Sequence, residues 1–86
     1  MNLRNFLEKC NGKNIKVEID MGVIRKVTLE EIVYNIKEDE ISIIGNVNDA
    51  EAVINLNEIR NVEAIENKAI IILDDKNDTK IEITIL

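Results

Sequence analysis

Residues 14–29, NIKVEIDMGVIRKVTL, carry the strongest local pattern in the sequence. The first half of this stretch alternates apolar and charged residues, which is typical of a β-strand with one buried face. Gly22 can adopt the positive φ angle that a tight turn requires. We therefore predict an antiparallel hairpin with strands at 14–20 and 23–29.

Outward from this hairpin, the same alternation or short apolar runs predict strands at residues 31–37, 40–45, 52–59, 69–74 and 80–86. The links between these segments are short, so consecutive strands should pair antiparallel as a meander, because a parallel crossover needs a dozen or more residues. Ile59, Val62 and Ile65 recur every three residues, and we interpret them as an apolar face at a corner between two strands.

The N-terminal segment has the spacing of a helix. Its apolar residues follow the i, i+3, i+4, i+7 pattern, which predicts one apolar stripe on a helix over about residues 2–11: Leu3, Phe6, Leu7 and Cys10. A helix this short is not stable in water by itself, and we therefore expect it to pack on the sheet. In that position Cys10 would be a small buried hydrophobic residue. We predict a single α+β domain over residues 1–86, with this helix packed on an antiparallel, strongly bent sheet or small barrel of about five to six strands.

Charge and composition limit the function. The chain has 17 acidic and 11 basic residues, and its net charge of -6 opposes the long-range attraction used in nonspecific nucleic-acid binding. It has no histidine, and it has no Gly-rich phosphate loop or Gly-x-Ser-x-Gly elbow. Adjacent acidic residues on a strand point to opposite faces, which does not favour paired carboxylates. We expect no enzyme activity, no metal site and no cofactor.

The sequence also bears on the environment of the protein. The single cysteine cannot form an internal disulfide, and a secreted domain of this size usually has several. The N-terminus lacks the apolar stretch of a secretory signal, and the longest apolar run, residues 69–73, is too short to span a bilayer. We expect a soluble cytoplasmic protein.

An unbroken apolar run at residues 70–73 predicts a strand with apolar side chains on both faces, one of them directed at the helix or at a partner chain. Residues 81–86 are expected to form a strand at the edge of the sheet. We predict a homo-oligomeric interaction or assembly module, or one that binds another protein. The residues predicted to carry self-association are Ile71, Leu73, Ile81, Ile83 and Ile85.

Residues 2–29, NLRNFLEKCNGKNIKVEIDMGVIRKVTL, are similar in layout to the helix and first hairpin of the Sm-like superfamily, and more weakly to the YolD-like family of small bacterial barrels. The resemblance concerns architecture and covers about residues 2–66. The C-terminal hairpin of residues 69–86 exceeds the minimal Sm-like fold, and a PH-like sheet would accommodate it. In the Sm-like family, RNA contacts come from an acidic residue and an asparagine after the second strand, and from Arg-Gly before the last strand.

The two motif regions depart from that family pattern. In EEIVYNIKED (residues 30–39), Asn35 stands where the family's asparagine would be, but Tyr34 precedes it. In INLNEIRNVEAI (residues 54–65), Asn57 and Glu58 fall where Arg-Gly belongs, and a glutamate is unfavourable beside a phosphate. The resemblance implies an alternative function, nucleic-acid or nucleotide binding, through Asn35, Asn57, Arg60, Arg25 and Lys26.

Overall fold

The computed structural model describes residues 3–86. Within that range the chain forms, in order, α1 (Leu3–Cys10), β1 (Ile15–Asp20), β2 (Ile24–Leu29), β3 (Ile32–Ile36), β4 (Glu40–Gly45), β5 (Glu51–Asn55), the short 3-10 helix η1 (Leu56–Glu58), β6 (Ile59–Ile65), β7 (Lys68–Leu73) and β8 (Lys80–Ile85). The predicted α+β class, with an N-terminal helix and antiparallel strands, is confirmed.

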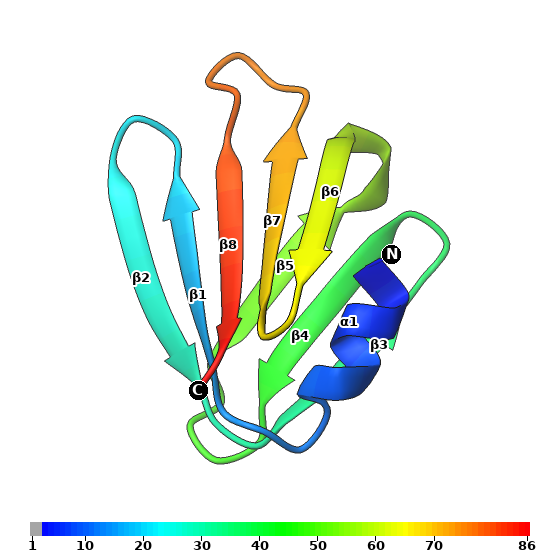
Figure 1. Cartoon of the computed structure of the whole chain (residues 1–86), viewed down its shortest axis with the longest axis vertical. Coiled ribbons are helices and arrows are strands. Elements are labelled where there is room, and N and C mark those ends of the chain that lie inside the picture. Colours follow the sequence, from blue (N-terminus) through cyan, green and yellow to red (C-terminus); the bar gives the residue numbers. More distant parts are fainter. Residues whose placement is uncertain (1–2) are drawn as a thin grey trace.

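The strands form two antiparallel sheets. The large sheet has the order β2-β1-β8-β7-β6, and the small sheet has the order β3-β4-β5. Figure 1 shows the large sheet in front of the small one, with α1 at the side where β3 and β6 lie. The described residues form no closed barrel, so the predicted bent sheet or small barrel of five to six strands is instead two layers, of five and three strands.

The predicted hairpin at residues 14–29 is confirmed. β1 and β2 pair antiparallel from Ile15 opposite Leu29 to Asp20 opposite Ile24. Gly22 has a φ of +95°, and its backbone N–H donates to Asp20 Oδ1 at 3.1 Å. The turn forms at this point because glycine adopts the positive φ at little cost.

The predicted meander holds inside each sheet but not between the sheets. The consecutive pairs β1–β2, β3–β4, β4–β5, β6–β7 and β7–β8 are antiparallel, whereas β2 does not pair with β3 and β5 does not pair with β6. β1 pairs instead with β8 over the full length of both strands. The prediction that residues 81–86 form an edge is therefore wrong, because β8 lies between β1 and β7.

One strand differs from the predicted pattern. Residues 52–59 were predicted as one strand, but β5 ends at Asn55, η1 follows, and β6 begins at Ile59. The register of β6 against β7 shifts between Ile59 and Asn61, which marks a β-bulge at Arg60. The bulge inserts an extra residue, so Ile59 and Val62 are three apart and yet both contact the core. The predicted corner is thus a bulged strand, and the predicted apolar face is wrong at Ile65, which is 71% exposed.

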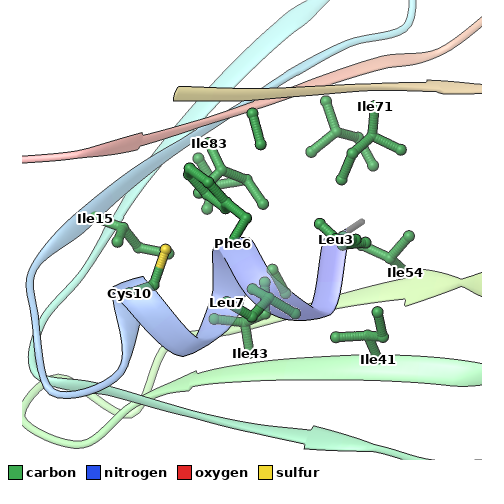
Figure 2. Close-up of a cluster of buried hydrophobic side chains, with 14 of the residues drawn as sticks. Leu3, Phe6, Leu7, Cys10, Ile15, Ile41, Ile43, Ile54, Ile71 and Ile83 are labelled. Atoms are coloured by element: carbon green, nitrogen blue, oxygen red, sulfur yellow. The ribbon is translucent and has the colours of Figure 1, made fainter. Parts of the chain in front are cut away.

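The hydrophobic core lies between the sheets and is filled from the side by α1. All four residues of the predicted apolar stripe, Leu3, Phe6, Leu7 and Cys10, are buried. In Figure 2 the helix side chains lie between Ile71 and Ile83 of the large sheet and Ile41 and Ile43 of the small sheet. Burial raises the pKa of the Cys10 thiol to about 11, and nearby Lys13 and Lys9 offset this only in part. Cys10 is therefore a protonated core residue at neutral pH.

Two polar contacts attach α1 to both sheets. The Tyr34 hydroxyl of β3 donates a hydrogen bond to Glu8, and this bond raises the pKa of Tyr34. Lys9 Nζ donates to the backbone oxygen of Glu66, in the turn between β6 and β7, at 2.6 Å. The helix thus links the β3 side of the small sheet to the β6–β7 hairpin of the large one.

At the opposite side, the turn between β4 and β5 holds the two sheets together. Asn48 Nδ2 donates to the backbone oxygen of Thr28 in β2 at 2.7 Å. A Cβ atom at Gly45 would fall on Asn48 Oδ1 and lie 3.2 Å from the backbone nitrogen of Glu30. The absence of a side chain at residue 45 therefore lets Asn48 reach β2.

Replacing Gly45 with alanine is expected to lower the free energy of unfolding by about 1–3 kcal/mol, because the methyl group displaces Asn48 and presses on the Glu30 backbone. Urea denaturation of Gly45→Ala measures this loss. In an Asn48→Ala background the same substitution should cost clearly less. An equal cost in both backgrounds would show that Asn48 is not the obstacle.

Candidate interaction surface

The residues predicted to carry self-association lie mainly inside the protein. Ile71 and Ile83 are fully buried, Leu73 and Ile81 are buried, and Ile85 is half-buried. They share one face of the large sheet, and that face is covered by α1 and the small sheet. They cannot form an outer surface in the folded protein, because alternate residues of β7 and β8 point into the core.

The residues predicted to contact nucleic acid do not gather at one place. Asn35 lies on β3 of the small sheet, and Asn57 lies in η1. Arg25 and Lys26 lie on β2, whereas Arg60 lies on β6, at the opposite edge of the large sheet. Four strand spacings separate these two edges, or about 19 Å. The five side chains therefore do not line a single pocket.

Arg60 has a structural contact of its own. Its Nη1 atom lies 3.1 Å from Oδ1 of Asp78, in the loop between β7 and β8. Both side chains are more than half exposed, so this ion pair adds little to stability. Arg60 is the bulged residue of β6, and the bulge is the feature that directs an extra side chain towards the loop.

The loop between β7 and β8 is organised by Asp75. Its Oδ1 atom accepts hydrogen bonds from the backbone N–H groups of Asn77 at 3.1 Å and Thr79 at 2.9 Å, and Oδ2 accepts from the Thr79 hydroxyl at 2.6 Å. The hydroxyl bond from Thr79 is the main reason that the pKa of Asp75 is lowered. The hydrogen bonds of Asp75 therefore fix the conformation of this acidic turn.

Asp75→Ala is expected to reduce the melting temperature at neutral pH and to have little effect in acid. The lowered pKa means that the carboxylate stabilises the folded state above its unfolded pKa of about 4, and this stabilisation is lost as pH falls through the folded pKa. Thermal unfolding of both proteins from about pH 7 to about pH 2 measures the difference. Asp74→Ala is the control, and a difference that is constant across pH would contradict the assignment.

The outer face of the large sheet is mostly polar. Lys68 Nζ lies 2.8 Å from Oε1 of Glu82, and this contact raises the pKa of the lysine and lowers that of the glutamate. Beside it, a shallow hollow of about 180 Å³ is lined by Glu63, Ile65, Lys68 and Ile70. Among residues 3–86, no group of three or more suitable side chains could hold a metal ion.

The two sheets of the described chain have four edge strands: β3 and β6 lie on the side that α1 fills, and β2 and β5 lie at the opposite side. Within the described chain, β2 pairs only with β1 and β5 pairs only with β4. Ile24 of β2 is 55% exposed, and Val53 of β5 is 53% exposed. We call residues 24–26 the basic edge, because they include Arg25 and Lys26, and residues 51–53 the acidic edge, because they include Glu51.

The sequence did not identify these edges as sites. Residues 24–26 (IRK) and 51–53 (EAV) carry no local pattern that distinguishes an edge strand from a central one. Their exposure depends on which strands pair, and the β1–β8 pairing leaves β2 at an outer position. Arg25 and Lys26 were predicted as contact residues, but for nucleic acid.

Comparison of the chain with protein families, curated proteins and solved structures gives no match. The Sm-like and YolD-like resemblances stay predictions. In residues 3–86, no helix is both long and apolar enough to cross a bilayer.

Proposed function

We propose that this protein is a non-enzymatic interaction or assembly module that associates with further copies of itself through its sheet edges. The observation that supports this best is that β2 and β5 are edge strands, and that each carries an apolar side chain that is more than half exposed, Ile24 and Val53. An open edge presents unpaired backbone N–H and C=O groups, which is a template for pairing with another chain.

The chemistry of the described residues supports a binding role over catalysis. The chain has no histidine, and the only cysteine is buried and protonated at neutral pH. The lowered pKa values of Asp75 and Glu82 come from hydrogen bonds to Thr79 and to Lys68, respectively, and neither carboxylate lies in a deep pocket. Such groups hold loops and strands and do not prepare a proton transfer.

Multi-angle light scattering and sedimentation velocity, over about 1 to about 500 µM protein, test the proposal. We expect the weight-average mass to rise with concentration, because short edge contacts give weak association. A mass that stays at one chain over the whole range would overturn self-association.

A further inference from the structure

The direction of backbone groups along the basic edge follows from two hydrogen bonds. Met21 N–H donates to Val23 C=O inside the β1–β2 hairpin, and Thr28 C=O accepts from Asn48 on the outer side of β2. In an antiparallel ladder, residues alternate between bonding to the neighbour and facing away from it. The odd residues of β2 therefore bond to β1, and Ile24 and Lys26 direct their N–H and C=O groups outward.

The same reasoning applies to the acidic edge. Gly45 N–H donates to Ala50 C=O, and Leu56 N–H donates to Asp39 C=O, so the even residues of this segment bond to β4. Alternation then places the backbone groups of Glu51 and Val53 on the open side. Each edge thus has two residues, separated by one other residue, whose backbone N–H and C=O groups point away from the neighbouring strand.

We infer that β2 of one molecule pairs antiparallel with β5 of a second copy, with Lys26 opposite Glu51 and Ile24 opposite Val53. This register is the one in which both outward residues of each edge meet a complementary side chain, a cation with an anion and an apolar residue with an apolar residue. The inference rests on the proposed function and adds its partner, its strands and its register.

Charge favours this partner over simple self-pairing of either edge. Pairing β2 with β2 through the middle of the strand would oppose Arg25 with Arg25 or Lys26 with Lys26, which is unfavourable. Pairing β5 with β5 would leave Glu51 without a cation. Among residues 3–86, neither Lys26 nor Glu51 has an ion-pair partner within its own molecule. Lys26 lies opposite Glu18 on β1 without forming an ion pair with it, so both side chains can contact a second copy.

The extent of the contact is also set by the structure. Beyond Lys26 the pairing ends at Thr28, because the outward carbonyl of that residue already accepts from Asn48. The contact is therefore short, with three residues on each strand. Lys26 lies on the outer face of the large sheet and Glu51 on the outer face of the small sheet, so the joined sheets would have one continuous outer face.

Charge reversal tests the register. Lys26→Glu and Glu51→Lys are each expected to weaken self-association about fivefold to tenfold, measured by sedimentation velocity. The double variant Lys26→Glu/Glu51→Lys should restore the wild-type affinity, because the pair is again complementary. In an equimolar mixture of the two single variants, the unchanged lysine edge of one would face the unchanged glutamate edge of the other, so the mixture should also associate.

Matched controls separate this pair from the effect of total charge. Lys16→Glu changes the net charge as Lys26→Glu does, but it lies on β1, inside the large sheet. Glu63→Lys changes the net charge by the same amount as Glu51→Lys, but Glu63 lies on β6, at the edge of the large sheet opposite β2. Both controls should leave the association constant within about twofold of wild type.

A backbone variant tests the strand pairing independently of charge. Ile24→Pro removes an N–H group that faces away from β1, so the hairpin should still fold, and the thermal transition verifies this. Association should fall at least about fivefold. If the wild type associates but the reversed pair restores nothing and Ile24→Pro has no effect, the register is wrong while self-association stands. If the wild type stays monomeric, both proposals fail.

Discussion

Phe6→Ala is expected to lower the free energy of unfolding by about 3–5 kcal/mol, which is a large part of the total for a domain of this size. Phe6 is fully buried and lies between the two sheets, on the side of α1 that points at Ile83. It is the only phenylalanine in the chain. No neighbouring aromatic group is present among the buried residues of the described chain to refill the space, so the substitution leaves a cavity.

The position of Phe6 explains why this cost is high. α1 fills the open side between β3 and β6, and its four inward side chains occupy the space between the sheets. In an 86-residue chain the core is thin, so the loss of one large side chain removes a sizeable fraction of the buried apolar area. The helix and both sheets should consequently unfold together.

Urea denaturation followed by circular dichroism measures the effect. Phe6→Leu keeps most of the volume and should cost about 1 kcal/mol, which preserves a folded protein for comparison. Arg4→Ala, on the exposed face of α1, is the control and should stay within about 0.5 kcal/mol of wild type. A loss below about 1 kcal/mol for Phe6→Ala would mean that α1 is not part of the cooperative core.

The features that the sequence predicted well are those set by neighbouring residues. The i, i+3, i+4, i+7 spacing of Leu3, Phe6, Leu7 and Cys10 identified the helix and its buried face, because that spacing matches the helical repeat. The alternation at residues 15–20 and the glycine at residue 22 identified the first hairpin for the same reason. Local geometry was enough for both.

The features that the sequence did not predict depend on distant parts of the chain. The pairing of β1 with β8 joins residues near the two ends of the described chain. The alternation of apolar and polar residues in a strand does not indicate which strand it pairs with. The bulge at Arg60 adds one residue to β6, so the inward residues Ile59 and Val62 are three apart instead of two. This spacing was interpreted as a corner between two strands. Both errors concern tertiary structure, which local periodicity does not encode.

The candidate site depended on the same information. Ile71 and Ile81 were predicted to be at the surface because their strands are rich in isoleucine, yet strand order places them at the centre of the large sheet. Lys26 and Glu51 became candidates for self-association only when β2 and β5 were found at the edges of their sheets. The order of the strands in the sheets, and not their composition, decides which strand is central and which strand has an unpaired edge.

Ile71→Lys is expected to unfold the protein, whereas Ile70→Lys is expected to be tolerated. Ile71 is fully buried beneath α1, and a lysine there would place an ammonium group in the core without a partner, at a cost of more than about 4 kcal/mol. Ile70 lies on the other face of β7 and pairs with Glu63 on β6 and Glu82 on β8. A lysine at residue 70 meets two carboxylates there, so its effect should be within about 1 kcal/mol.

The two variants are adjacent in the sequence and identical in chemistry, so the difference between them isolates the direction of the side chain. Circular dichroism and one-dimensional NMR at room temperature should show a folded spectrum for Ile70→Lys and an unfolded one for Ile71→Lys. Equal stability of the two would mean that β7 does not alternate between a core face and an outer face. The same two variants also test whether Ile71 contributes to self-association. If Ile71 lay at an interface between two copies, Ile71→Lys would give a folded monomer. Because Ile71 is buried, we expect an unfolded protein instead.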